Sequence, residues 1–272
     1  MLPVAKTTED VMYGRFPVAT ILLILINVVV HIVVVFHPNY ILPYAISASD
    51  IYRELGVVPI AIVRGEKLWT LFTSMFLHGD FYHLLGNMLF LYFFGGAVEN
   101  AMGSKRFLLF YFISGLFAHY VNILVIYFIP QEYLLTNYGF SPWTVPAIGA
   151  SGAISGVMGA YLIYYPRTKL SLVYFIAIIP LFVTLPAWAY IGLWFLTQLI
   201  LGILVLVGLT YSSIAFWAHI GGFMAGVVLA PFFLSPRVKA MIRTRRVIEK
   251  YELIIPPEHK EAIIEEAGEE AQ

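Results

Sequence analysis

Four polar residues in an otherwise apolar sequence have side chains that could together hydrolyse an acyl bond. Ser151 and His219 are the residue types that form a nucleophile and its general base. His83 and Asn87 are four residues apart, so they share one face of a helix, and both can donate hydrogen bonds to an oxyanion. No carboxylate is placed to join them, because Glu99 lies 12 residues beyond Asn87, roughly 18 Å along a helix. The set therefore predicts a Ser–His dyad.

Glycines surround both members of the predicted dyad. Ser151 stands in the string Gly-Ala-Ser-Gly at residues 149–152, and Gly222 and Gly226 follow His219. Small residues let two membrane helices approach closely, as a hydrogen bond between the serine and the histidine requires. Each string alone also fits a structural role, because glycine-rich membrane helices pack through such strings and a single histidine can join two helices.

The other titratable residues have simpler interpretations. His78 and His83 are five residues apart, a poor spacing for two ligands on one helix face, so we expect no metal site and no cofactor. We interpret Glu99 and Arg106 as a structural clamp of a loop. The remaining histidines are interpreted as structural or lumen-facing (His31, His119) or as solvated (His37, His259).

The composition places these residues in a membrane. Of the 272 residues, 60% are hydrophobic and 12% are charged, whereas soluble domains carry about 25% charged residues. Between Arg106 and Arg237 the only charged residues are Glu132, Arg167 and Lys169, too few to cover a soluble surface. This excludes a disordered chain, a nucleic-acid binder and an ordinary cytosolic enzyme. The absence of cysteine excludes disulfides and thiol catalysis.

Charge-free stretches of about 20 residues predict six membrane-spanning helices and hence an all-α polytopic protein. The six are Pro17–Phe36, Phe81–Val98, Phe107–Ile129, Val145–Tyr165, Ala187–Leu209 and Ile214–Leu234. A seventh stretch, Leu170–Pro186, is short and contains Pro180, so we interpret it as interfacial, re-entrant or a lead-in to the fifth span.

The basic residues favour six spans over seven. With six, the basic loops after the second and fourth spans, the N-terminal segment and the basic tail fall on one side, which the positive-inside rule makes cytoplasmic. A seventh span would place the basic tail opposite the basic fourth loop. We therefore expect a multi-pass protein of the cell membrane with both termini in the cytoplasm.

This topology brings the four polar residues to one depth. The second, fourth and sixth spans run in the same direction, and His83, Asn87, Ser151 and His219 are the third, seventh, seventh and sixth residues of their spans. With a rise of 1.5 Å per residue, all four lie within about 10 Å of the outer interface.

The chain divides into three predicted regions. Residues 1–16 form a cytoplasmic segment without the pattern of a signal peptide, so the first span is expected to be retained. Residues 17–234 form the six-span domain. Its first loop is semi-apolar but contains Arg53, Arg64 and Lys67, so we expect it to lie partly in the outer interface. Residues 235–272 form a basic and then acidic cytoplasmic tail, with a partner-binding helix as the alternative.

In their order along the chain, these motifs resemble the rhomboid family of intramembrane serine proteases. The resemblance covers residues 69–230 and rests on four strings. They are His-Gly-Asp-Phe-Tyr-His-Leu-Leu-Gly-Asn at 78–87, Gly-Gly-Ala-Val-Glu at 95–99, Gly-Ala-Ser-Gly at 149–152, and Ala-His-Ile-Gly-Gly-x-x-x-Gly at 218–226. The apolar stretch before the fifth span resembles prokaryotic members. Thr70 departs from the family pattern, because many members have arginine after the tryptophan that corresponds to Trp69, and Ala101 stands near where an arginine is usual.

The resemblance implies a six-helix rhomboid bundle with a partly submerged first loop. It implies Ser151 as the nucleophile and His219 as the base. It also implies an oxyanion hole made by His83, Asn87 and the backbone N–H of Ser151.

Three functions remain in competition. The first is a serine endopeptidase that cuts single-span membrane proteins near their outer end, with substrate helices and lipid as partners and neither nucleic acid nor metal. The second is a catalytically inactive rhomboid-like protein that binds membrane clients. The third is a transporter, which would place polar groups across the whole membrane width and not at one depth.

A substrate helix and water must both reach the predicted dyad. The short hydroxylated loop Thr210–Ser213 leads into Phe216 and Trp217, and we expect it to be a mobile lid. Trp194, on the bulky face of the fifth span, is predicted to gate lateral entry, with an interfacial anchor as the alternative.

Overall fold

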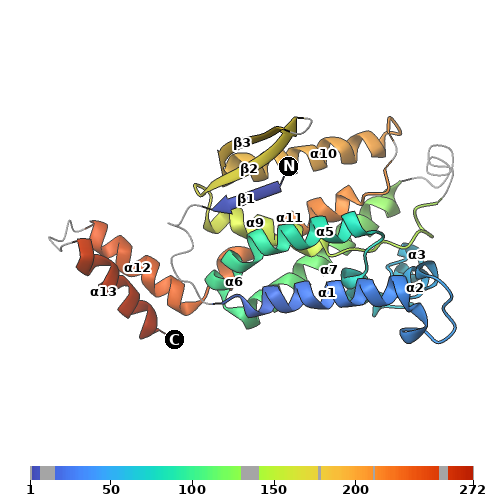
Figure 1. Ribbon diagram of the computed structural model, residues 1–272, viewed down its shortest axis with the longest axis horizontal. Coiled ribbons are helices and arrows are strands. Elements are labelled where there is room, and N and C mark those ends of the chain that lie inside the picture. The colour runs from blue at the N-terminus through green and yellow to red at the C-terminus, as the bar shows by residue number, and fades with distance from the viewer. Residues whose placement is uncertain are drawn as a thin grey trace.

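The computed structural model is a polytopic helical bundle, as the sequence predicts (Figure 1). It describes residues 2–6, 16–129, 141–176, 179–210, 212–250 and 257–271. Within these ranges, five helices are long and apolar enough to cross a membrane. They are α1 (Val18–Phe36), the continuous helix Phe81–Met102, α7 (Ser104–Phe128), α10 (Ala187–Leu206) and α11 (Phe216–Phe233). The fourth predicted span is the shorter apolar helix α9 (Ser151–Tyr164).

The helix Phe81–Met102 has three parts. These are α5 (Phe81–Phe90), a π-helical turn (Leu91–Gly95) and α6 (Gly96–Met102). Asp80 caps its start by accepting a hydrogen bond from the backbone N–H of His83 at 2.9 Å. It ends at Gly103, whose φ of 82° favours glycine.

The fourth span begins later than the sequence suggested. We expected a helix from Val145, but α9 begins at Ser151, because residues before it take a non-helical course. Pro146 cannot donate a backbone hydrogen bond, and Gly149 has a φ of 125° that side chains rarely allow. Ser151 is therefore the first residue of its helix and not its seventh.

The spanning helices, with the shorter α9 included, lie along the long axis of the molecule, and successive ones run in opposite directions (Figure 1). Contacts at one end join elements far apart in sequence. The backbone N–H of Ser235 donates to the carbonyl of Ala101 at 3.0 Å, and Glu99 accepts from the backbone N–H of Ala19 at 2.9 Å. The start of α1 and the end of α11 therefore lie at the same end of the bundle.

The first loop, residues 37–80, is folded into short helices. They are a 3₁₀ turn at Pro38–Tyr40, α2 (Ala48–Leu55), α3 (Pro59–Val63), α4 (Thr70–Thr73) and a 3₁₀ turn at Ser74–Phe76. Many of its apolar side chains are exposed, including Ile46 at 91% and Trp69 at 56%. Such a surface fits the prediction of a loop in contact with lipid.

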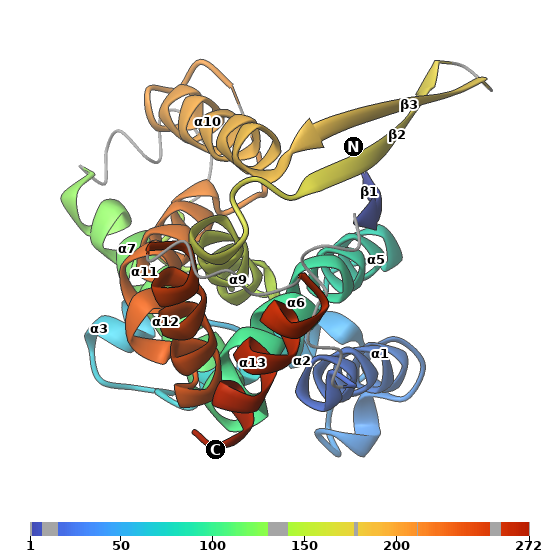
Figure 2. The same cartoon turned by 90° about the vertical axis from the view of Figure 1, so that its left-hand side faces the viewer.

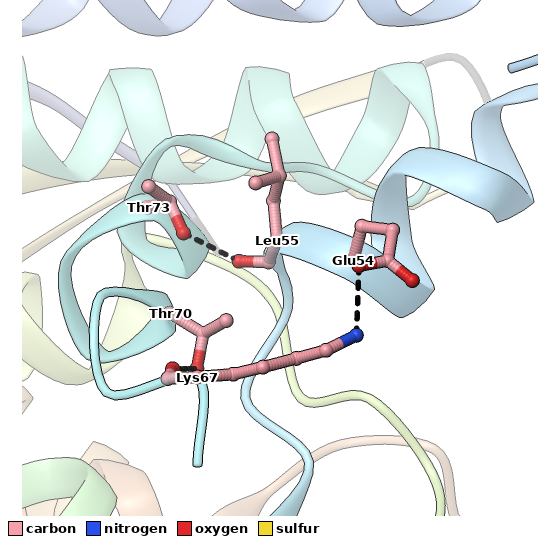
Figure 3. A network of polar contacts seen from close by, with 5 residues as sticks. All are labelled: Glu54, Leu55, Lys67, Thr70 and Thr73. Atoms are coloured by element: carbon pink, nitrogen blue, oxygen red, sulfur yellow. Dashed lines mark hydrogen bonds and ion pairs between the residues drawn. The ribbon is translucent and has the colours of Figure 1, made fainter. Parts of the chain in front are cut away.

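Polar contacts hold this loop together where the family arginine is missing (Figure 3). Lys67 Nζ lies 2.8 Å from Glu54 Oε2, and the Thr70 hydroxyl donates to the Lys67 carbonyl at 2.7 Å. The Thr73 hydroxyl donates to the Leu55 carbonyl, also at 2.7 Å. The ion pair between Lys67 and Glu54 thus joins α2 to the turn that precedes α4.

The centre of the bundle is built on α7, α9 and α11, whose backbones approach closely. A Cβ atom at Gly222 or Gly226 of α11 would collide with the carbonyl of Gly152 or Gly156 of α9. On the other face of α9, a Cβ at Gly152 would collide with Ala118 of α7. The predicted small-residue faces are therefore used for close helix packing.

A small sheet is the main departure from the all-α expectation. The stretch Leu170–Pro186, for which we expected an interfacial, re-entrant or lead-in segment, forms a hairpin of β2 (Lys169–Ile176) and β3 (Ile179–Pro186). β1 (Leu2–Lys6) pairs antiparallel with β2 to give the order β1-β2-β3. The sheet lies beside the bundle, with β1 against α5 and the hairpin against α10 (Figure 2).

The tail forms two helices beyond one end of the bundle (Figure 1). These are α12 (Pro236–Lys250), which is basic, and α13 (Pro257–Glu269), which is acidic. They pack against each other through Met241, Ile248 and Ile264.

Candidate active site

Ser151 and His219 meet across the contact between α9 and α11. His219 Nε2 lies 2.8 Å from Ser151 Oγ, which is hydrogen-bonding distance. Ser151 is the first residue of α9 and His219 the fourth of α11, and the two helices start at the same end of the bundle. The close approach at Gly152 and Gly222 brings the two side chains together.

Gln198 is a third member of this contact, and sequence reasoning missed it. Its Oε1 lies 2.8 Å from His219 Nδ1, and it belongs to α10. The sequence itself contained a signal for Gln198, because an amide side chain inside an apolar span is costly unless it has a hydrogen-bond partner.

His83 faces the segment before Ser151. A Cβ atom at Gly149 would lie 2.9 Å from His83 Nε2, so only glycine leaves room for this ring. The backbone N–H of Gly79 points at His83 Nδ1 at 3.4 Å. Because an N–H can only donate, Nδ1 accepts, and the proton of the neutral ring is on Nε2. His83 thereby presents a hydrogen-bond donor toward the site.

Asn87 lies one turn further along α5. Its side chain is buried, and its Nδ2 has no hydrogen-bond partner among the described residues. A buried amide donor without an acceptor costs free energy, so the position is strained unless a ligand or water accepts from it.

The start of α9 supplies further donors. The first N–H groups of a helix have no intrahelical acceptor and carry the positive end of its dipole. The first loop holds this turn in place, since the N–H of Gly149 donates to the Ser74 carbonyl at 2.9 Å and Val57 pairs with Ala147. Ser74 in turn contacts His119 of α7, with Oγ and Nε2 3.1 Å apart.

The predicted gate residues line the contact between α10 and α11. Phe216 is 5% exposed, and it and Trp217 lie against Gly202 of α10. Trp194 packs on His219 with ring centroids 6.2 Å apart and on Phe223. Of the predicted lid Thr210–Ser213, Tyr211 lies outside the described residues, and Ser213 is exposed. Whether these residues gate entry remains a prediction.

Glu99 does not pair with Arg106 as expected. Its carboxylate accepts hydrogen bonds from the backbone N–H groups of Ala19 and Thr20 and from the hydroxyls of Thr20 and Ser104, at 2.6 to 2.9 Å. It therefore caps the start of α1, where free N–H groups attract an anion. Arg106 donates instead to the Leu234 carbonyl at 3.4 Å.

His78 lies outside the spanning helices, directly before α5. Its ring is 1% exposed, and neither ring nitrogen has a hydrogen-bond partner among the described residues. The rings of His83 and His31 lie 5.1 and 6.5 Å away, centre to centre. Burial, and after it the neighbouring His83 and His31, lower the pKa of His78 to about 3.

Comparison with known proteins decides the family. The model of the rhomboid domain matches residues 65–236, which is more than half of the chain and includes all four predicted site residues. The chain belongs to the rhomboid family. The resemblance inferred from the motifs is thus confirmed, and with it a multi-pass membrane protein.

Other rhomboids share parts of this sequence. RHOMBOID-like protein 1 of Arabidopsis thaliana is 29% identical over 73% of this chain and 43% of its own length. The putative rhomboid protease YdcA of Bacillus subtilis is 34% identical over 38% of this chain and 44% of its own. The rhomboid protease GluP of Bacillus subtilis is 39% identical over 37% of this chain and 16% of its own. The chain therefore matches less than half the length of each of these relatives.

Proposed function

We propose that this rhomboid is a serine endopeptidase that hydrolyses peptide bonds of transmembrane substrates near the outer face of the cell membrane. The observation that carries the proposal is the 2.8 Å contact between Ser151 Oγ and His219 Nε2, with the His83 ring against Gly149, two residues before the serine. Relatives named as rhomboid proteases give it further support.

The chemistry follows from the roles of these atoms. His219 Nε2 takes the proton of the Ser151 hydroxyl while Oγ attacks the carbonyl carbon of the scissile bond. The carbonyl oxygen becomes an oxyanion, which can accept from Asn87 Nδ2, His83 Nε2 and the backbone N–H of Ser151. The protonated His219 then gives its proton to the leaving amine. Water hydrolyses the acyl-enzyme by the same steps, with His219 again as the base.

A rhomboid that binds clients without cutting them is the alternative. Such a protein does not need a nucleophile, a general base and oxyanion donors together in one site. Here the serine lies within hydrogen-bonding distance of its base, the His83 ring lies against Gly149 two residues before the serine, and Asn87 Nδ2 is left without an acceptor among the described residues. A buried hydrogen-bond donor without an acceptor raises the free energy of the folded protein, and an oxyanion would offset this cost by accepting from it. This favours an active enzyme.

Cleavage by single-residue variants tests the proposal. The purified protein is reconstituted with a single-span model substrate, and cleavage is followed on gels. We expect Ser151→Ala and His219→Ala each to abolish cleavage and the double variant to lose no more, because nucleophile and base act as a unit. Ser114→Ala, which alters another buried serine, is the control and should retain most of the activity. Near-normal cleavage by either dyad variant would sink the proposal.

A further inference from the structure

Both ring nitrogens of His219 lie within hydrogen-bonding distance of a partner, and the partner of Nδ1 is an uncharged side chain. Nε2 lies 2.8 Å from Ser151 Oγ, and Nδ1 lies 2.8 Å from Gln198 Oε1. Gln198 comes from α10, a different helix from those that carry the dyad. Three helices therefore meet at one imidazole.

The partner of Nδ1 decides which nitrogen carries the proton of the neutral ring. An amide oxygen can only accept, so Nδ1 must be the protonated nitrogen when it bonds to Gln198. Nε2 then has a free lone pair directed at the Ser151 hydroxyl. In the other tautomer Nε2 would carry the proton and could not act as a base toward Ser151.

α10 holds the ring by its face as well as by its edge. Trp194 lies one helical turn before Gln198, and residues four apart share a helix face. The Trp194 ring is 6.2 Å from the His219 ring and inclined to it by 31°, and Trp194 also packs on Phe223. Gln198 thus stands on a helix face that is already packed against the imidazole.

We propose that Gln198 is the positioning residue of the dyad, fixing His219 in the Nδ1-protonated tautomer that makes Nε2 the base. This inference rests on the proposed function. An amide fixes the ring without adding a charge, whereas a buried carboxylate in an apolar bundle is costly. Among the described residues, the buried carboxylate of Glu99 binds the start of α1 and not the dyad.

Three variants separate positioning from packing. Gln198→Met keeps the length of the side chain but has no amide acceptor, Gln198→Glu keeps an acceptor, and Ile200→Ala alters an exposed site on the same helix. We expect Gln198→Met to lower kcat roughly 10- to 100-fold with little change in KM, less than the full loss of a general base. Gln198→Glu should retain activity, and the acid limb of its pH profile should move to higher pH because a carboxylate favours protonated His219. Ile200→Ala should match the wild type.

Nitrogen-15 NMR of histidine-labelled protein gives a readout independent of cleavage. The His219 signals, assigned by their loss in His219→Ala, should show one Nδ1-protonated tautomer in the wild type and a mixture in Gln198→Met. A wild-type tautomer and kcat in Gln198→Met, or a loss of kcat that only follows a lower Tm in all Gln198 variants, would overturn the inference. If the wild type cleaves no substrate, the proposed function fails while the tautomer still decides the role of Gln198.

Discussion

Single residues at the site differ in whether their polar side-chain atoms already have hydrogen-bond partners. His219 has a partner at each ring nitrogen, and His83 accepts from Gly79. Asn87 Nδ2 has none among the described residues. The group left free is therefore a hydrogen-bond donor, which suits the stabilisation of negative charge and not the binding of a cation.

Asn87 should therefore act mainly in the transition state. We expect Asn87→Ala to lower kcat by roughly 10²- to 10³-fold and to leave KM nearly unchanged, the usual cost of losing one oxyanion donor. His83→Ala should have a similar but smaller effect, because a water molecule can replace its donor. Steady-state cleavage kinetics in detergent measure both. A rise in KM alone for Asn87→Ala would instead assign this residue to substrate binding.

His78 should make the fold sensitive to acid. The unfolded chain protonates this ring near pH 6.5, but the folded chain does so only near its pKa of about 3. Its contribution to stability is thus fully present above pH 6.5 and is lost as the pH falls toward 3, by up to about 1.4 kcal/mol per pH unit. Thermal unfolding between pH 7 and 4 should show a shallower fall in Tm for His78→Asn than for the wild type. His259→Asn, which alters an exposed histidine, should leave the slope unchanged.

At the level of helices and strands, the sequence predicted where the elements lie along the chain better than it predicted whether a segment is a helix or a strand. Charge-free stretches located the long helices within a few residues, because burial in lipid requires such stretches. The hairpin β2–β3 escaped prediction because nearly every residue of the segment is apolar, so neither a period of 2 nor one of 3.6 is visible. The late start of α9 followed from Pro146 and Gly149, and both residues were visible in the sequence.

The contact between α9 and α11 should tolerate no side chain at its glycines. Gly226→Ala would drive a Cβ into the Gly156 carbonyl, a backbone atom that cannot rotate away. We expect a loss of about 1–3 kcal/mol or more, the range for overpacking a core. Gly192→Ala on α10 meets nothing within 4 Å and should be neutral or slightly stabilising. Thermal unfolding in detergent compares the two, and equal Tm values would contradict the close packing of α9 and α11.

The predicted gate between α10 and α11 is tested best at Phe216. Trp194 also contacts the His219 ring, so its replacement would mix two effects. Phe216→Ala should lower stability by about 3–5 kcal/mol, as for a buried phenylalanine, yet maintain or increase cleavage by loosening the gate. Cleavage that falls in step with Tm would show that Phe216 only packs.

Over the whole molecule, the reactive residues could be predicted from the sequence better than the residues that hold them in place. The sequence predicted one depth for the four residues because spans of equal direction begin at the same end, and the charge pattern indicates those directions. Gln198 and the first-loop contacts with Gly149 depend on which helix faces meet. No periodicity in a single sequence encodes that, since these spans are apolar on all sides.

The orientation in the membrane can be measured directly because the chain has no cysteine. We expect Ser49→Cys, at an exposed polar position of the first loop, to react with a membrane-impermeant maleimide on intact cells. Glu270→Cys in the tail should react only after lysis, because the basic loops and tail favour the cytoplasmic side. Labelling of Glu270→Cys on intact cells would reverse the proposed topology.

The central claim is that Ser151 is an activated nucleophile, and a fluorophosphonate probe tests it most directly. Such a probe bonds covalently to a serine whose proton is removed by a neighbouring base. With the detergent-solubilised wild type, we predict a single adduct, located by mass spectrometry on Ser151, that disappears in Ser151→Ala and His219→Ala and persists in Ser114→Ala. Folded wild-type protein that acquires no adduct, or an adduct that survives in Ser151→Ala, would contradict the account.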